Sequence, residues 1–277
     1  MHSSLPRLQT PALACDSNIH IYDTAMPVAP TANGPGPAWA TVTAYRAVQV
    51  RLGTSRVVVT QPTAYGTDNT CTVAAIAALG LATTRGVAVV DASVNDAELH
   101  RLHEAGIRGV RFQMLPGGAL PWEMLEPVAA RIAGLGWHIQ LQMDGRLLPD
   151  REALISHLPC AVMIDHIGKF LEPVPVDHPG VKCLQRLLDR GNIWLKLAGP
   201  YEVSKSGPPH YADVGLLAKL AVRTHPERLV WASNWPHVAA TVPPDDVTLL
   251  DLLLEWAPDA ATQRQILTDN PAVLYGF

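Results

Sequence analysis

Two patterns of hydrophobic and polar residues alternate along the chain, one typical of strands and one typical of helices. Eight short apolar runs, each bounded by polar or turn residues, have the composition of buried β-strands. Between most of them lie longer stretches whose apolar residues recur at the 3.6-residue spacing of an amphipathic helix. The runs cover residues 14–22, 56–61, 86–91, 109–113, 137–142, 161–166, 193–198 and 229–234, and the clearest helical stretches are 95–105, 121–135 and 213–224.

Strands that alternate with helices form parallel βα units, and eight such units predict closure into a barrel. The chain has 277 residues, close to the usual size of one such barrel. We therefore expect an α/β protein with a single (β/α)8 TIM-barrel domain over residues 1–277. An open, doubly wound sheet is the alternative, and the lack of a glycine-rich phosphate turn after an early strand argues against it.

Composition excludes several classes of function. The net charge is −4, so no basic field favours nucleic acid, and 48% hydrophobic residues argue against disorder. No apolar run reaches the roughly 18 residues of a membrane-spanning helix, and the first ten residues lack the apolar segment of a signal peptide. Four scattered cysteines indicate reduced thiols. A cytoplasmic location is expected, and the sequence leaves the oligomeric state open.

Polar side chains gather where the predicted strands end. In a barrel of this type, the carboxyl ends of the strands carry the chemistry. Two long loops, 27–37 and 204–210, follow the first and seventh strands on the same face. The strand-end residues considered are Asn18, His20, Gln61, Arg111, Gln142, His166, Lys196 and Asn234, with Tyr201 and His237 shortly beyond.

Three segments resemble the lactonase branch of the amidohydrolase superfamily. DSNIHIYD (16–23) resembles the first-strand His-x-His signature, MIDHIGKF (163–170) the sixth-strand segment, and LVWASNWPH (229–237) the last-strand segment. The order and spacing of further matches extend the resemblance over nearly the whole chain. It implies an amidohydrolase-type barrel that acts on a small acidic lactone, by hydrolysis or by isomerisation.

Two departures from that pattern bear on mechanism. Asn18 stands where the signature has its first histidine, and Asn234 where the branch usually has an aspartate. Neutral amides are poor ligands for a divalent metal, so we expect no catalytic metal and no other cofactor. An asparagine also has no site that accepts a proton near neutral pH. Either a histidine is the base, or a substrate hydroxyl is the nucleophile, or Asn234 replaces a native aspartate.

The expected reaction is metal-independent acyl transfer on a sugar-acid or dicarboxylate lactone by ring-opening hydrolysis. Intramolecular lactone isomerisation is the alternative, and a non-catalytic barrel that binds a sugar acid is a third possibility. His20 and His166 are expected to donate hydrogen bonds to the oxyanion and to shuttle a proton, with Asn18 and Asn234 beside them. Binding of substrate is expected from Arg111 for a carboxylate, and from Gln142, Lys196, Tyr201, Gln61 and His237 for other polar groups.

Overall fold

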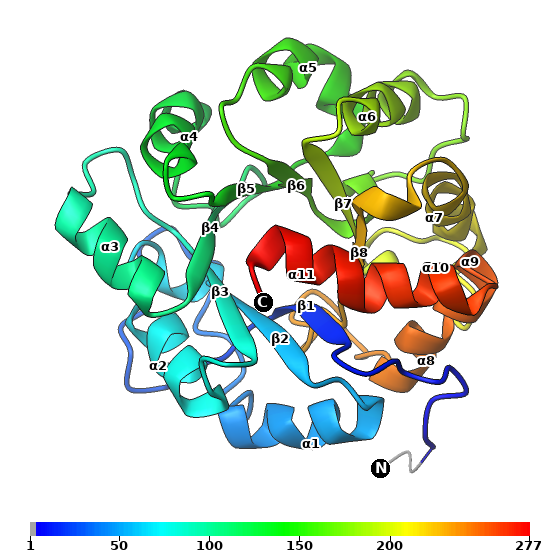
Figure 1. The fold of residues 1–277 in the computed structure, drawn as a ribbon, viewed down its shortest axis with the longest axis horizontal. Coiled ribbons are helices and arrows are strands. Elements are labelled where there is room, and N and C mark those ends of the chain that lie inside the picture. Colours follow the sequence, from blue (N-terminus) through cyan, green and yellow to red (C-terminus); the bar gives the residue numbers. More distant parts are fainter. Residues whose placement is uncertain (1–3) are drawn as a thin grey trace.

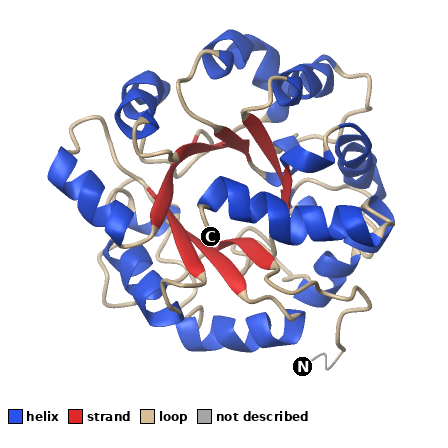
Figure 2. Cartoon of the chain, in the orientation of Figure 1, coloured by secondary structure: helices blue, strands red, loops and turns tan. Residues whose placement is uncertain are grey.

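The chain folds into one barrel of eight parallel strands, as the sequence predicts (Figures 1 and 2). This is a computed structural model that describes residues 4–277. The strands pair in sequence order. They are β1 (Cys15–Ile19), β2 (Arg56–Thr60), β3 (Thr84–Ala88), β4 (Ile107–Gln113), β5 (His138–Gln142), β6 (Val162–Ile164), β7 (Ile193–Leu197) and β8 (Leu229–Trp231).

Helices cover the outside of the barrel (Figure 2). Seven of them connect consecutive strands: α1 (Val42–Leu52), α2 (Thr70–Leu79), α3 (Asp96–Glu104), α4 (Leu125–Ala133), α5 (Leu148–Ser156), α6 (Pro179–Asp189) and α7 (Ala212–Thr224). After β8 come α8 (Asp246–Asp251), α9 (Leu253–Trp256), α10 (Ala260–Arg264), a π-helical turn (Gln265–Asp269) and α11 (Asn270–Tyr275). None of the helices described is long and apolar enough to cross a membrane.

The barrel closes through the main chain beyond β8. His20 donates its backbone N–H to the carbonyl of Trp235 at 2.9 Å, and Asn234 donates to the carbonyl of Asn18 at 3.1 Å. Asp16 reinforces this seam, because its carboxylate accepts from the backbone N–H (2.9 Å) and the hydroxyl (2.6 Å) of Ser233. These bonds make a closed barrel and exclude the open-sheet alternative.

The two ends of the barrel interior differ in polarity. At one end, Leu274 and Tyr275 of α11 pack on an apolar layer of Cys15, Val58, Val87, Met163, Trp194 and Val230. Helix α11 lies across that opening of the barrel (Figure 1). Toward the carboxyl ends of the strands, the interior becomes polar, with buried Asn18, Thr60, Gln140, Asp165 and Lys196. The open, polar end is therefore where a site can form.

Several strands end earlier than the hydrophobic pattern predicts. His20, His166 and Asn234 lie one to three residues beyond the ladders of β1, β6 and β8. His166 and Asn234 have φ values of 53° and 63°, which side-chain-bearing residues rarely adopt and which often mark functional sites. The three residues therefore begin the loops at the carboxyl ends of these strands.

Candidate active site

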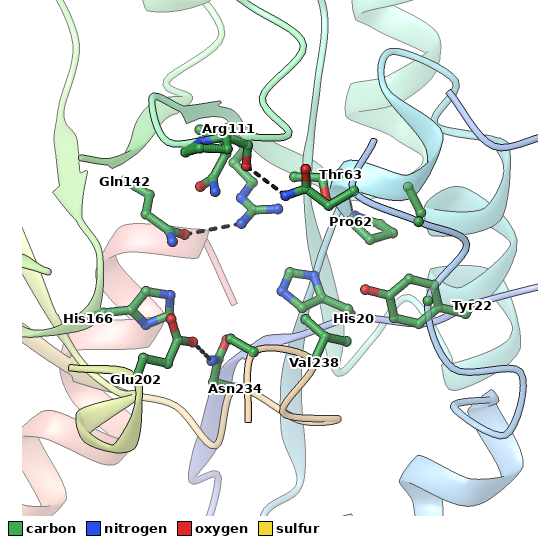
Figure 3. A pocket seen from close by; sticks show the side chains of 17 residues that line it. His20, Tyr22, Pro62, Thr63, Arg111, Gln142, His166, Glu202, Asn234 and Val238 are labelled. Atoms are coloured by element: carbon green, nitrogen blue, oxygen red, sulfur yellow. Dashed lines mark hydrogen bonds between the residues drawn. The ribbon is translucent and has the colours of Figure 1, made fainter. Parts of the chain in front are cut away.

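A cavity of about 300 Å³ opens at the carboxyl ends of the strands (Figure 3). Its lining residues come from β4, β5 and the loops after β1, β2, β4, β6, β7 and β8. They are His20, Tyr22, Asn33, Gly34, Gly36, Pro62, Thr63, Ala64, Arg111, Gln113, Pro116, Gln142, His166, Glu202, Asn234, Val238 and Ala239. The volume suits a small ligand, at the lower limit of typical small-molecule sites.

Arg111 places a buried positive charge in the wall of the cavity. It is 7% exposed, and its guanidinium donates to the backbone carbonyl of Gln61 at 3.0 Å and to Oε1 of Gln142 at 3.1 Å. These two bonds hold the planar group in place, while Nε has no partner. A fixed guanidinium with unused N–H groups is suited to bind a carboxylate with two parallel hydrogen bonds.

His20 is held as a neutral imidazole with a defined tautomer. Its Nδ1 lies 2.8 Å from the carbonyl oxygen of Thr60, which only accepts, so Nδ1 carries the proton. Burial, followed by the charges of Arg111 and Lys196, lowers the pKa of His20 to about 3. Nε2 of the neutral ring is therefore a hydrogen-bond acceptor. The oxyanion-donor role expected for His20 from the sequence does not fit this tautomer.

His166 is a second neutral imidazole on the cavity wall. Burial, and then the positive charges of Lys169, Lys196 and Arg111, lower its pKa well below the ordinary value. Its Nδ1 is buried without a hydrogen-bond partner. No neighbour therefore fixes its tautomer, and the ring is free to carry its proton on Nε2.

Hydrogen bonds to both the oxygen and the nitrogen of the Asn234 amide fix its orientation. Its Oδ1 accepts from Nδ2 of Asn18 at 3.0 Å, and its Nδ2 donates to Oε1 of Glu202 at 2.7 Å and to the hydroxyl of Tyr201 at 2.9 Å. Glu202 in turn forms an ion pair with Lys169, and both of these side chains are 7% exposed. Burial lowers the pKa of Lys169 to about 8. The surroundings of residue 234 are therefore complementary to an amide.

A buried ammonium ion occupies the centre of the polar layer beneath the cavity. Lys196 Nζ lies 2.8 Å from Oδ1 of Asp165 and donates to Oδ1 of Asn18 at 3.0 Å, with both charged side chains fully buried. The same Asn18 oxygen also accepts from Thr60 Oγ1 (2.9 Å) and Gln140 Nε2 (3.1 Å). This layer fixes Asn18, which then fixes Asn234.

The residues present do not fit a divalent metal. Within residues 4–277, no three His, Cys, Asp or Glu side chains are grouped to hold a metal ion. The Asn18 oxygen already accepts three hydrogen bonds, one of them from a cation. A second cation at that oxygen would face the ammonium of Lys196. The remaining strong donors on the cavity wall are two neutral imidazoles and the carboxylate of Glu202, whose oxygens are already bonded to Asn234 and Lys169.

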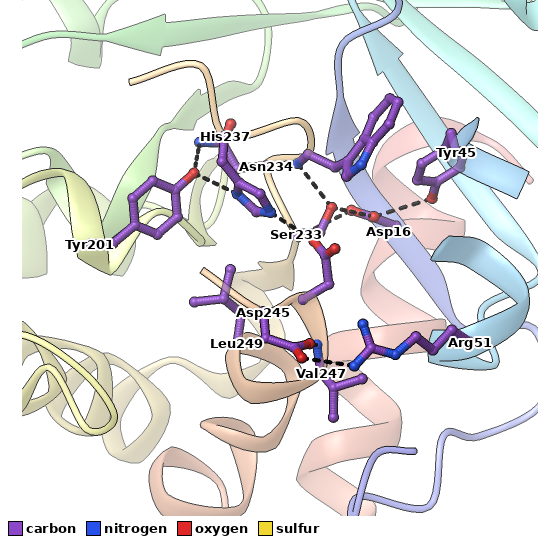
Figure 4. Close-up of polar contacts among 12 residues, drawn as sticks. Asp16, Tyr45, Arg51, Tyr201, Ser233, Asn234, His237, Asp245, Val247 and Leu249 are labelled. Atoms are coloured by element: carbon purple, nitrogen blue, oxygen red, sulfur yellow. Dashed lines mark hydrogen bonds and ion pairs between the residues drawn. The ribbon is translucent and has the colours of Figure 1, made fainter. Parts of the chain in front are cut away.

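A hydrogen-bonded chain supports Asn234 from outside the cavity (Figure 4). His237 Nε2 lies 2.8 Å from Asp246 Oδ1, and its Nδ1 lies 2.9 Å from the hydroxyl of Tyr201. The hydroxyl of Tyr201 accepts from Asn234, so it donates its own proton to Nδ1 of His237, and Nε2 of His237 donates to Asp246. Every donor in this chain has an acceptor, so its direction is fixed.

Four residues expected to bind substrate do not line the cavity. The side chain of Gln61 is fully buried and bonds the carbonyls of Gly66 (3.2 Å) and Asp68 (2.7 Å), so only its backbone supports the site, through Arg111. Lys196 lies beneath the cavity in its ion pair, and Tyr201 and His237 lie behind Asn234. Their contacts indicate positioning roles. His20, His166, Arg111, Gln142 and Asn234 do line the cavity, and their roles stay predictions.

Sequence reasoning missed Glu202 and Lys169. Glu202 directly follows Tyr201 in a 3-10 turn (Pro200–Glu202) after β7, and Lys169 lies in the sixth-strand segment that the resemblance already singled out. Neither residue lies at the end of a predicted strand, and the candidate residues were selected by that position. Gln113, Tyr22 and Asn33 also line the cavity and were not among the residues expected to bind substrate.

Comparisons with known proteins agree with this architecture. The chain is 36% identical to the D-galactarolactone isomerase of Agrobacterium fabrum, over 99% of this chain and 95% of that protein. It is 34% identical to the 2-pyrone-4,6-dicarboxylate hydrolase of Comamonas testosteroni, with 98% and 93% covered. A crystal structure of an Agrobacterium tumefaciens protein superposes with a TM-score of 0.93 at 36% identity, covering 98% of each chain.

The family resemblance seen in the sequence is confirmed. The amidohydrolase family model matches residues 14–277, from the residue before β1 to Phe277. This match, like the two relatives above, covers almost every element of the barrel. The chain belongs to the amidohydrolase family.

Proposed function

We propose that this protein is an enzyme that catalyses acyl transfer at the carbonyl of a small sugar-acid lactone, without a metal or other cofactor. The observation that carries the proposal is the placement of Arg111 and His20 on one cavity: a fixed cation that suits a carboxylate, beside a neutral imidazole that accepts a proton. The relatives named as lactone hydrolases and a lactone isomerase support the same class of substrate.

The charges on the wall favour a lactone with one carboxylate. Among the lining residues described, Arg111 is the only permanent cation and Glu202 the only carboxylate. A second carboxylate on the ligand would find no further cation in the wall, and burying an unpaired charge is costly. Gln113, Asn33 and Thr63 offer polar groups for hydroxyls instead. We therefore infer a monoanionic, hydroxyl-bearing lactone in preference to a dicarboxylate.

The proposed reaction needs a proton acceptor and an oxyanion donor. An attacking hydroxyl gives its proton to Nε2 of His20 as its oxygen bonds to the lactone carbonyl carbon. His166 donates a hydrogen bond to the oxyanion, which in general contributes about 3–4 kcal/mol. When the ring C–O bond breaks, His20 returns the proton to the leaving alkoxide. The positive charge of Arg111 is one cause of the low pKa of His20. A substrate carboxylate bound to Arg111 offsets that charge and so makes His20 a better proton acceptor.

For the nucleophile, we propose a hydroxyl of the substrate itself, which gives isomerisation between lactone ring sizes. Asn234 is held as an amide and cannot act as a base toward water. Intramolecular attack needs less activation because the effective concentration of the hydroxyl is high. The strand-end aspartate that a hydrolase would use is absent from this position.

Ring-opening hydrolysis is the second candidate, and one observation favours it. Nε2 of His20 accepts a proton from water as readily as from a substrate hydroxyl, since its partner Thr60 holds only Nδ1. Relatives at 34–35% identity are named as hydrolases. We also propose a cytoplasmic enzyme, which the four free, buried cysteines support.

The test is a proton NMR time course with chelator-treated, metal-free protein. The substrates are the δ-lactone of galactaric acid and a dianionic pyrone dicarboxylate, each run against its spontaneous reaction. We expect accelerated conversion of the monoanionic lactone and at least a tenfold lower kcat/KM for the dianion. Activity that disappears on chelation and returns with zinc would overturn the metal-free proposal.

A further inference from the structure

We propose that Glu202 determines the outcome of the reaction. Its carboxylate is engaged by Asn234 and Lys169 and requires a hydrogen-bond donor at position 234, so neither side chain is a free carboxylate base for water. This inference rests on the proposed function and names a residue pair, Glu202 and Asn234, that decides between isomerisation and hydrolysis. Figure 3 shows the two side chains joined on the wall below His166, facing the same cavity as His20.

The hydrogen bonds leave position 234 one orientation. Glu202 Oε1 accepts from Asn234 Nδ2 at 2.7 Å, and an ionised carboxylate has no proton to donate in return. On the opposite side, Asn18 must donate, because its own oxygen is taken by Lys196, Thr60 and Gln140. Residue 234 therefore has to present a donor toward Glu202 and an acceptor toward Asn18, which an amide does and an ionised carboxylate does not.

An aspartate at position 234 would meet Glu202 carboxylate to carboxylate. With the geometry unchanged, two oxygens would lie about as close as the present bond, and two carboxylates at that distance share a proton. One of them would stay protonated near neutral pH, or the side chains would move apart. In Asn234→Asp alone, the one remaining negative charge is therefore shared with Glu202 through that proton, and residue 234 is a weaker base for water than an unshared carboxylate.

Exchanging the two functional groups removes this conflict. In the double variant Glu202→Gln, Asn234→Asp, the new amide donates to the new carboxylate and its oxygen still accepts from Lys169. The net charge of the pair is unchanged. The hydroxyl of Tyr201 then donates to residue 234, and Nδ1 of His237 loses that donor, so the recovery is expected to be partial. This swap variant has a carboxylate base on the cavity wall beside His166.

The first half of the test measures stability and needs no substrate. Urea unfolding at pH 7.5 is compared for the wild type, both single variants and the swap variant. We expect both single variants to unfold at lower urea concentrations than the wild type. The swap variant should recover more than half of the free energy of unfolding that Asn234→Asp loses. Asn270 is a matched control, because it is a buried asparagine whose amide donates to backbone carbonyls far from Glu202. When Asn270→Asp is combined with Glu202→Gln, the double variant should recover none of the free energy of unfolding that Asn270→Asp loses.

The second half follows the products of the galactaric δ-lactone in H₂¹⁸O. Hydrolysis adds water across the acyl C–O bond and brings one ¹⁸O into the open-chain acid, whereas isomerisation brings none. We expect the swap variant to form labelled acid at least tenfold faster than Asn234→Asp. Equal rates in these two variants, or additive stability losses, would overturn the role of Glu202. An inactive wild type with the stability recovery intact would instead count against the proposed function alone.

Discussion

Lys196 Nζ lies 3.0 Å from Asn18 Oδ1, inside a barrel where neither side chain reaches solvent. The ammonium balances the carboxylate of Asp165 at 2.8 Å and fixes the Asn18 amide. Asn18 then orients Asn234 on the cavity wall. A buried ion pair thus sets the geometry of a site that neither of its members lines, and it takes the oxygen that a metal would need.

Replacing Lys196 by methionine should destabilise the fold strongly, because Asp165 would remain buried without its cation. Loss of one member of a buried pair generally costs about 3–5 kcal/mol. Urea unfolding at pH 7 measures this. The control is Arg186→Met, which removes an exposed ion pair with Glu152 and should cost less than about 1 kcal/mol. Equal, small losses in the two variants would show that the buried pair contributes little.

The rate should not follow the titration of an ordinary histidine. The pKa of His20 is lowered to about 3, so Nε2 stays free to accept a proton throughout the range from pH 5 to 8. We therefore expect kcat/KM to be nearly constant across that range, and His20→Gln to lower kcat by about 10²–10⁴-fold. Circular dichroism at each pH controls for unfolding. A fall in kcat/KM centred between pH 6 and 7 would contradict the assigned state of His20.

Arg111 should matter only when the substrate carries a carboxylate. Removing a buried, hydrogen-bonded charge partner generally costs about 2–5 kcal/mol, so Arg111→Met should lower kcat/KM by roughly 30- to 5000-fold. Arg111→Lys keeps the charge but loses the planar, two-pronged donor, so its kcat/KM should lie between those of the wild type and Arg111→Met. With the methyl ester of the same lactone, wild type and Arg111→Met should differ by less than tenfold. A similar loss on the ester would indicate that Arg111 acts through structure.

The stability of the protein should begin to fall at pH values well above the ordinary pKa of carboxylates. Burial lowers the pKa of His20 and His138 to about 3, and that of His166 well below its ordinary value. Unfolded imidazoles bind protons below about pH 6.5, so the unfolded state gains protons there and stability falls as pH falls. Asp16 opposes this, because burial raises its pKa to about 6 and the folded state holds that proton.

At pH 5, three histidines and one aspartate give a net uptake of about two protons on unfolding, or roughly 2.7 kcal/mol of stability per pH unit. Urea unfolding between pH 4.5 and 7 tests this slope. His138 lies outside the cavity lining, and His138→Gln should lower the uptake by about one proton. A stability that does not change over this range would contradict neutral, buried histidines.

The sequence predicted the barrel because its signals are periodic and local. Apolar runs and helical stripes mark the eight βα units, and His20, Arg111, Gln142, His166 and Asn234 stand at strand ends where the cavity forms. Strand boundaries were less accurate, since polar residues that close the runs turn out of the ladder toward the opening.

The pairing of side chains could not be predicted in the same way. Glu202 reaches Asn234 from a turn 32 residues earlier in the chain, and this contact depends on how the loop after β7 folds back. Gln61 directly follows β2, where a substrate-binding residue would stand, but the loop at residues 66–68 folds back and accepts hydrogen bonds from its amide. Full burial of Lys196 likewise depends on barrel closure.

The most direct test of the account is the fate of the galactaric δ-lactone with chelator-treated wild-type protein in H₂¹⁸O, followed by proton NMR and mass spectrometry. We expect accelerated formation of the unlabelled γ-lactone in the absence of any metal. Accelerated formation of ¹⁸O-labelled open-chain acid would contradict the substrate hydroxyl as nucleophile and establish hydrolysis instead. No acceleration over the spontaneous reaction would contradict lactone chemistry with this substrate altogether.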